Sequence, residues 1–316
     1  MRTLLNRAGL GAPTFLWIAV LVGCGLMWTL AWPQPAFAET ITVNSTADVL
    51  DATDDRCTLR EAIIAANSDT ASGNLGAYPG ECAAGNGADT VVFAAAGTYT
   101  LTLPGTGEDA AAGGDLDVTA ALTLAGRGVD STTIQAGSAS PLPPGNCQDC
   151  IDRVLDAFAP LAISDLTLRY GTVELGPGGG LRVNDGSVVA ASNIAVLDSV
   201  SQFGVGGGIG VLLGGVLTLD GSLVQGNFAA GGSGLFNAGQ AALDQVTVSD
   251  NAAVDGLGSI SSLGTLTVTR SSVISNTRCT PFRKVSPSSC LPSVSWAMAW
   301  ANSAMVSASS WVALRM

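Results

Sequence analysis

Histidine is missing from this chain of 316 residues. Without it, Ser-His-Asp and Cys-His nucleophile systems cannot form in their usual arrangement. Zinc sites with His ligands and metalloprotease sites are excluded for the same reason. Carboxylate chemistry is the main catalytic option that remains.

Positive charge is scarce and unevenly placed. Lys284 is the only lysine, and residues 39–277 hold seven Arg against all 25 carboxylates, which gives this segment a net charge of −18. Nucleic-acid affinity depends on clustered Lys and Arg, so a nucleic-acid partner is excluded. Metal cations or basic surfaces suit this charge better.

Aromatic side chains are also few. Residues 39–277 contain no Trp and only three Tyr, at positions 78, 99 and 170. Grooves that process sugars normally stack aromatic rings on their substrates. The Gly-Gly-Gly runs at 178–180 and 206–208 lack the Lys-Ser/Thr pair of a phosphate-binding loop. They indicate tight turns.

The first 38 residues have the pattern of a secretory signal. Arg2 and Arg7 precede a 19-residue apolar run, and Ala36-Phe37-Ala38 follows it. This small-x-small ending predicts cleavage after Ala38. Two alternatives stay open: a lipobox that would make Cys24 a lipidated N-terminus, and an uncleaved membrane anchor, which the apolar length permits.

One sequence pattern recurs three times between residues 215 and 276. GVLTLDGSLVQGN ends at Asn227, GQAALDQVTVSDN at Asn251 and GTLTVTRSSVISN at Asn276, at intervals of 24 and then 25 residues. A unit this short cannot bury its own apolar face, so the copies must stack. The pattern predicts a solenoid in which the three Asn form a ladder, each side-chain amide bonding to the next.

The repeat divides the chain into four parts. They are a signal peptide (1–38), an N-terminal cap with the first coil (39–103), repeats (104–277) and a tail (278–316). Seven coils are expected, beginning near Asp89, Asp115, Arg153, Gly178, Gly206, Gly232 and Gly258.

The cap contains one predicted helix. Thr58 and Glu61 in CTLREAIIAANS form a capping box, so the helix should begin at Thr58 or Leu59. Such a helix would cover the apolar side chains and strand edges of the first coil. Its apolar face would hold Leu59, Ala62, Ile63 and Ala66.

The CTLREAI segment resembles the signature of the CSLREA domain, found at the N-terminus of exported bacterial proteins with right-handed parallel β-helix repeats. Similar segments follow in order at 87–105, 108–126 and 153–171, so the resemblance covers residues 39–277. It implies an all-β fold: a right-handed parallel β-helix of the pectate-lyase-like kind with one short helix in its cap. It implies no activity, because the family is recognised by its cap and repeats.

Export permits disulfides. Four Cys remain in the body once Cys24 and the tail are set aside, and an even count suits two bridges. We predict the pairs Cys57–Cys82 and Cys147–Cys150. The Cys-x-x-Cys spacing of the second pair is also typical of redox and zinc motifs, but the body has no His and no second such pair. A small structural loop is therefore favoured.

Two acidic loops supply oxygen ligands of the kind that Ca²⁺ prefers. One carries Asp51 and Asp54, and the other carries Asp115 and Asp117. Neither loop follows an EF-hand or nonapeptide calcium spacing, and ligand number alone does not make a site. Structural calcium is therefore one interpretation of these acids, and solvated turns are the other.

The same acids bear on catalysis. Asp115 and Asp117 share a face at i, i+2, and Arg182 is close in sequence to Asp185. Polysaccharide hydrolases use paired acids, and related lyases use acid-bound Ca²⁺ with an Arg or Lys base. No complete catalytic motif accompanies these residues.

The pattern changes after Thr277. Acids stop, and three Trp appear together with the only lysine. We expect residues 278–316 to be an out-of-frame C-terminus or a disordered tail. The uncharged stretch 291–314 has the length of a membrane helix, but six Ser, one Asn and one Pro make it a poor one.

These features predict an exported, non-catalytic β-helix protein of the bacterial cell surface or exterior, serving adhesion or contact with an extracellular glycan or protein. Membrane contact is expected only through the signal or a lipid anchor. The alternatives are a polysaccharide lyase or glycoside hydrolase, and a structural spacer. An enzyme should show a cleft where several acids and an Arg converge, and a binding module a flat or grooved face.

Overall fold

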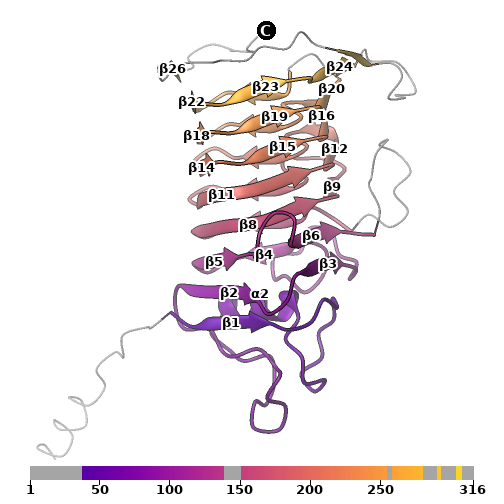
Figure 1. Cartoon of the computed structure of the whole chain (residues 1–316), viewed down its shortest axis with the longest axis vertical. Helices are drawn as coiled ribbons and strands as arrows, with labels where there is room; N and C mark the ends of the chain where they lie inside the picture. Colours follow the sequence, from indigo (N-terminus) through magenta and orange to yellow (C-terminus); the bar gives the residue numbers. More distant parts are fainter. Residues whose placement is uncertain (1–37, 139–150, 255–257, 280–289, 293–303, 308–316) are drawn as a thin grey trace, which may run out of the picture. The chain divides into compact units, whose positions relative to one another are not determined.

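The computed structural model describes residues 38–138, 151–254, 258–279, 290–292 and 304–307. These residues form mostly β structure, arranged in three sheets whose strands stack in rungs (Figure 1). The predicted Cys147–Cys150 pair, the signal segment with Cys24 and most of the tail lie outside this part of the chain.

Sheet A has 14 strands, and its main path runs β1-β2-β5-β8-β11-β14-β18-β22-β26. Its strands are β1 (Thr40–Val43), β2 (Asp89–Phe93), β3 (Gly97–Leu101), β5 (Leu122–Ala125), β6 (Thr132–Ala136), β8 (Leu161–Arg169), β11 (Val188–Leu197), β14 (Val216–Asp220), β15 (Leu223–Gln225), β18 (Gln240–Asp244), β19 (Thr247–Ser249), β22 (Thr265–Thr269), β23 (Ser272–Ile274) and β26 (Ala304–Ser307).

Sheets B and C have six strands each. Sheet B consists of β4 (Leu116–Val118), β7 (Leu155–Ala157), β10 (Leu181–Val183), β13 (Ile209–Val211), β17 (Leu235–Asn237) and β21 (Ile260–Ser262). Sheet C consists of β9 (Thr172–Val173), β12 (Val200–Val205), β16 (Phe228–Gly231), β20 (Ala252–Ala253), β24 (Thr277–Cys279) and β25 (Cys290–Pro292). The described strands pair in parallel except for β22 with β26 and β24 with β25, which are antiparallel.

The chain visits the sheets in a fixed order. From β7 to β24 it passes through sheet B, then sheet A, then sheet C, and repeats. Six predicted coil starts, from Asp115 to Gly258, lie one to three residues before a strand of sheet B, whereas Asp89 begins β2 of sheet A. This arrangement is compatible with a parallel β-helix.

The core lies between the sheets. In sheet B, one apolar residue of each strand stands in register with the next, and the first five of these side chains are buried. They are Leu116, Leu155, Leu181, Ile209, Leu235 and, half-buried at the end of the row, Ile260. Because side chains alternate between the faces of a strand, a slip of one residue would turn this row outward. The apolar pattern therefore fixes the register.

The predicted Asn ladder is present and buried. The Nδ2 of Asn227 donates to Oδ1 of Asn251 at 3.0 Å, and the Nδ2 of Asn251 donates to Oδ1 of Asn276 at 3.1 Å. Each Nδ2 also donates to a backbone carbonyl, those of Val196, Val224 and Val248 in turn. The ladder thus satisfies polar backbone groups that stacking removes from water.

Helix α2 (Leu59–Ser68) lies against β1 and β2 at the N-terminal end of the stack (Figure 1). Thr58 is its N-cap and forms the predicted capping box with Glu61. The whole predicted apolar face, from Leu59 to Ala66, is buried. Among the residues described, no helix is both long enough and apolar enough to cross a membrane.

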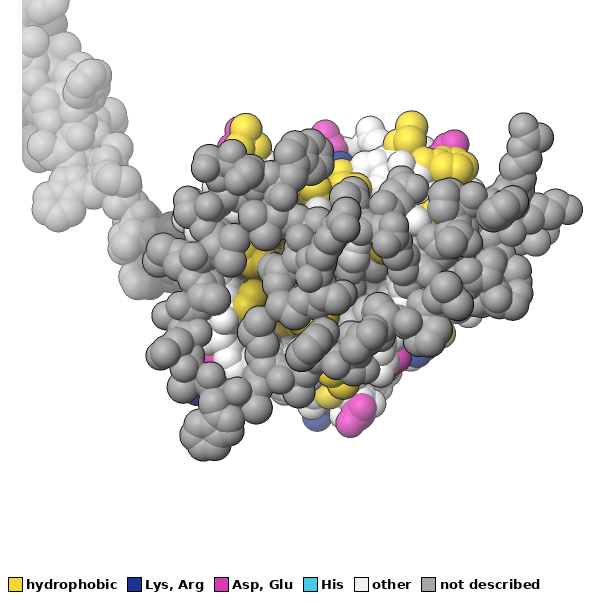
Figure 2. Space-filling view, turned by 90° about the horizontal axis from the view of Figure 1, so that it is seen from above, with side chains coloured by type: hydrophobic (Ala, Val, Ile, Leu, Met, Phe, Trp, Pro, Cys, Tyr) yellow, Lys and Arg dark blue, Asp and Glu magenta, His cyan; other side chains and the backbone are white. Residues whose placement is uncertain are grey.

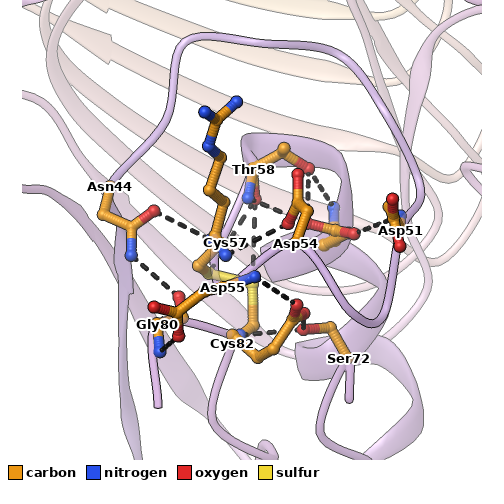
Figure 3. Close-up of a disulfide and its surroundings, with 12 residues drawn as sticks. Asn44, Asp51, Asp54, Asp55, Cys57, Thr58, Ser72, Gly80 and Cys82 are labelled. Carbon is orange, nitrogen blue, oxygen red and sulfur yellow. Dashed lines mark hydrogen bonds between the residues drawn. A yellow bond between two sulfur atoms is a disulfide. The ribbon is translucent and has the colours of Figure 1, made fainter. Parts of the chain in front are cut away.

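A disulfide joins Cys57 to Cys82 and confirms one of the two predicted pairs. Polar contacts surround it (Figure 3). Asn44 accepts the N–H of Cys57 at 2.8 Å and donates to the carbonyl of Gly80 at 2.8 Å. Ser72 accepts the N–H of Cys82 at 2.8 Å. The bridge and these bonds tie the loop before Cys82 to the beginning of α2.

Candidate functional site

Charged side chains form a row on the outer face of sheet B. Asp117 of β4, Asp156 of β7 and Arg182 of β10 are in register at the middle of their strands. The residues on either side of each are core residues, so these three side chains point away from the core. Asp117 and Asp156 are nevertheless fully buried.

Residues 104–115 cover this row, and we call them the covering loop. The N–H of Ala111 donates to Oδ2 of Asp117 at 2.9 Å. The loop folds back on itself at Gly114, which has φ of +60°, and a Cβ there would lie 1.8 Å from the carbonyl oxygen of Gly105. A side chain cannot fit at Gly114, so its glycine is required for the loop to close over sheet B.

Glu108 holds the turn of the covering loop. Its carboxylate accepts the N–H of Ala110 at 3.1 Å and that of Gly113 at 2.8 Å. Asp109, the next residue, is exposed. The loop therefore uses one acid internally and leaves the other at the rim of the buried cluster.

Arg60 of the CTLREA segment, in helix α2 of the N-terminal cap, holds the covering loop in place through hydrogen bonds. Its guanidinium is fully buried and pairs with Asp48 at 2.6 Å. It also donates to the carbonyls of Ala111, Gly114 and Asp115 at 2.9, 2.8 and 3.2 Å. This Arg therefore joins the helix to the loop above the acidic row.

Asn67, seven residues further along α2, adds a second fixed point. Its Nδ2 donates to the carbonyl of Asp117 at 2.7 Å, and its Oδ1 accepts the N–H of Thr119 at 2.9 Å. Residues seven positions apart lie on the same face of a helix. One face of α2 thus positions both the covering loop and β4.

Two arginines neutralise part of the acidic row. Arg182 binds both oxygens of Asp156, with Nε 2.9 Å from Oδ1. Arg153 lies between Asp115 and Asp156, with Nη1 at 3.1 Å from Oδ2 of the first and 3.4 Å from Oδ2 of the second. Asn184 donates to Oδ1 of Asp156 at 2.5 Å.

The carboxylate of Asp117 forms no ion pair with an arginine among the described residues. Its Oδ1 is buried, and none of the described residues donates a hydrogen bond to it. The pKa of Asp117 is raised to about 8, mainly by burial and then by the negative charges of Asp115 and Asp156, while the hydrogen bond from the N–H of Ala111 lowers it. Burial also raises the pKa of Asp115 to about 7, against the attraction of Arg153.

Three acids of this cluster can reach a common point. Single carboxylate oxygens of Asp109, Asp117 and Asp156 all lie within 4.8 Å of one another. Of the acids predicted as calcium ligands in the second acidic loop, Asp117 belongs to this group and Asp115 pairs with Arg153 instead. Sequence reasoning missed Asp156, although the Leu-Asp pairs at 116–117 and 155–156 occupy the same place in successive coils.

Other predicted site residues lie in ordinary turns. Oδ1 of Asp51 accepts the N–H and the hydroxyl of Thr53 at 3.1 and 2.8 Å, and Oδ1 of Asp54 accepts the N–H of Arg56 at 3.1 Å. Asp51 borders a groove of about 270 Å³ beside α2, lined mainly by small and apolar side chains. Arg182, noted in the sequence as close to Asp185, forms its ion pair with Asp156 of the neighbouring strand.

Comparison of the chain with protein-family models, with curated proteins and with solved structures found no match.

Proposed function

We propose that residues 39–277 are a right-handed parallel β-helix with a CSLREA-like cap, exported from the cell, and that they bind an extracellular glycan without cleaving it. The fold part of this proposal is supported by the parallel register of the three sheets and by the recurrent sheet order. The capping role of α2 and Arg60 in CTLREAI supports the family resemblance.

One surface feature carries the binding proposal. Leu175 and Phe203 are 71% and 64% exposed, and the N–H of Phe203 donates to the carbonyl of Glu174 at 2.9 Å. These two apolar side chains therefore belong to adjoining coils, and we call them the Leu175–Phe203 patch. Exposed apolar side chains are typical of interaction sites when they form a contiguous patch, and an aromatic ring can stack on the face of a sugar.

Charge indicates which glycans suit this surface. The segment 39–277 has a net charge of −18, and hydrophobic and acidic side chains lie next to each other at the edge of the molecule seen from above (Figure 2). Acidic polysaccharides would be repelled by this field. The proposed partner is therefore a neutral or basic glycan.

The disulfide supports export. Bridges such as Cys57–Cys82 persist in oxidising compartments and are rare in the cytosol. We therefore propose a secreted or envelope location, with cleavage after Ala38, and lipidation at Cys24 as the alternative.

The test is a binding screen of the purified protein against neutral, basic and acidic glycans. We expect a neutral or basic glycan to bind, and Phe203→Ser to weaken that binding about tenfold. Leu213→Ser is the matched control, because Leu213 is 78% exposed and lies in the turn between β13 and β14. Equal binding by Phe203→Ser and the native protein would contradict the proposed patch, and binding of none of the glycans would favour a structural spacer.

A polysaccharide lyase or hydrolase is the second candidate function. The convergence of Asp115, Asp117 and Asp156 with Arg153 and Arg182 favours it. Burial opposes it, since the scissile bond must reach both catalytic carboxylates. Release of new chain ends from any polysaccharide, lost in Asp117→Asn, would decide for the enzyme and against simple binding.

A further inference from the structure

The cluster on sheet B contains more negative charge than its arginines can neutralise. Five carboxylates gather there against two guanidinium groups, which leaves three negative charges in excess if all the acids ionise. The acids are Asp109, Asp115, Asp117, Asp152 and Asp156, and the bases are Arg153 and Arg182. Burying unpaired charges of one sign is costly unless a cation accompanies them.

One carboxylate oxygen of Asp117 has no hydrogen-bond partner among the described residues, and a bound cation would lie beside it. Oδ2 of Asp117 is occupied by the N–H of Ala111, whereas Oδ1 is fully buried and receives no hydrogen bond from the described residues. Buried polar atoms in folded proteins almost always have a partner. An atom such as this one therefore indicates a ligand beside it.

The spacing of the acids fits a single ion. Two oxygens that bind one Ca²⁺ at about 2.4 Å lie at most about 4.8 Å apart, and the oxygens of Asp109, Asp117 and Asp156 meet that limit. Asp156 already accepts two hydrogen bonds at each oxygen, from Arg182 and Asn184 at Oδ1 and from Arg182 and Arg153 at Oδ2. An ion would therefore take the place of the longest of them, the 3.4 Å contact with Nη1 of Arg153. Asp109 is exposed and provides the route by which an ion enters.

We propose that Asp109, Asp117 and Asp156 bind one calcium ion between the covering loop and strands β4 and β7. Calcium suits the site better than magnesium, because it accepts irregular geometry and magnesium requires a near-ideal octahedron. The ion would link the covering loop to strands β4 and β7. It would stabilise the position of this loop together with the hydrogen bonds that Arg60 donates to it. This inference does not depend on glycan binding.

The experiment is calorimetric titration of CaCl₂ into the calcium-free full-length protein. We expect binding by the native protein, about tenfold weaker binding by Asp109→Asn and none by Asp117→Asn. Asp54→Asn is the matched control from the other acidic loop and should bind like the native protein. Thermal unfolding should show a calcium-dependent rise in Tm for the native protein and the control, and no rise for Asp117→Asn.

Three outcomes would overturn the proposal. They are no calcium binding by the native protein at millimolar concentration, native-like binding by both Asp109→Asn and Asp117→Asn, and a Tm that responds to pH but not to calcium. The last outcome would assign a proton to Asp117 in place of the ion. Because Asp109 is exposed, Asp109→Asn leaves the fold intact and keeps the test valid if Asp117→Asn fails to fold.

Discussion

Asn251 satisfies four polar groups at the centre of the ladder. Its Oδ1 accepts the N–H and the Nδ2 of Asn227, and its Nδ2 donates to the carbonyl of Val224 and to Asn276. A buried group that loses its partner costs about 1–3 kcal/mol. At the scale of single residues, a short amide therefore contributes as much to stability as a large apolar side chain.

We expect Asn251→Ala to lower the free energy of unfolding by about 3 kcal/mol, because it leaves the N–H of Asn227 and the carbonyl of Val224 unpaired. Urea unfolding followed by circular dichroism measures this change. The control Thr218→Ala, at an exposed position, should change stability by less than about 0.5 kcal/mol. A similarly small effect of Asn251→Ala would contradict the proposed role of the ladder.

Asp244 is the acid most strongly affected by a surface ion pair. Hydrogen bonds from Arg270, with Nε 2.8 Å from Oδ1, and from the hydroxyl of Thr269 lower the pKa of Asp244 to about 2. A carboxyl whose pKa falls on folding stabilises the fold above its ordinary pKa. That contribution is lost as the pH falls through the lowered value.

Arg270→Gln should therefore raise the pKa of Asp244 toward that of an ordinary Asp. Carboxyl carbon NMR during a titration from pH 6 to below 2 measures it. Arg127→Gln, which removes a guanidinium elsewhere on the surface, should leave the pKa of Asp244 unchanged. The account of this pair is wrong if Arg270→Gln has no effect on the titration.

At the scale of elements, helix α2 holds the covering loop in place through the side chain of Arg60. Arg60 pairs with Asp48 and binds three carbonyls of residues 111–115. We expect Arg60→Met to cost about 3–5 kcal/mol, because it leaves Asp48 as an uncompensated buried charge. Arg60→Lys should also destabilise the protein, since an ammonium cannot replace the planar fork of donors.

Chemical denaturation and hydrogen exchange of residues 104–118 measure this effect. Arg56→Met is the matched control, because Arg56 is exposed and its loss should cost less than about 0.5 kcal/mol. Faster exchange in the covering loop of Arg60→Met, with slow exchange retained in β14 and β18, would agree with a local clamp. Unchanged exchange in the loop would contradict it.

Local patterns predicted the elements well. The capping box predicted a start at Thr58 or Leu59, and α2 begins at Leu59 with Thr58 as its N-cap. Six of the seven predicted coil starts lie one to three residues before a strand of sheet B. The recurrence of Asn at 24 and 25 residues gave the ladder. In each case the contacts that define the element lie within one helical turn or repeat at a nearly constant interval. Such contacts can therefore be recognised from the sequence alone.

The candidate site was less predictable, because its members come together only through tertiary contacts. Arg60 reaches residues more than 50 positions away, and Asp156 joins Asp117 across an interval of 39 residues that departs from the repeat. The covering loop has no periodic pattern. Spacing along the sequence therefore singled out Asp115, Asp117 and Arg182, but it did not reveal Asp156, which lies next to both Asp117 and Arg182 across the strands.

At the scale of the whole molecule, stacking makes each coil depend on its neighbours. The exposed face of sheet A contains one row of residues in continuous register from β2 to β22: Thr90, Thr123, Ala162, Ala190, Thr218, Ala242 and Thr267. Neighbouring strands of a sheet lie about 4.8 Å apart. Distances along this row should therefore increase in equal steps, although the sequence intervals differ.

Electron-spin distance measurement along this row tests stacking most directly. Spin labels would be placed through unnatural amino acids at Thr90 and, in turn, at Ala190, Thr218 and Ala242. The register places these partners three, four and five strands from Thr90. Stacked coils predict backbone separations of about 14, 19 and 24 Å, with one narrow distribution each. Separations that do not rise in equal steps, or broad distributions for all three pairs, would contradict a continuous stack.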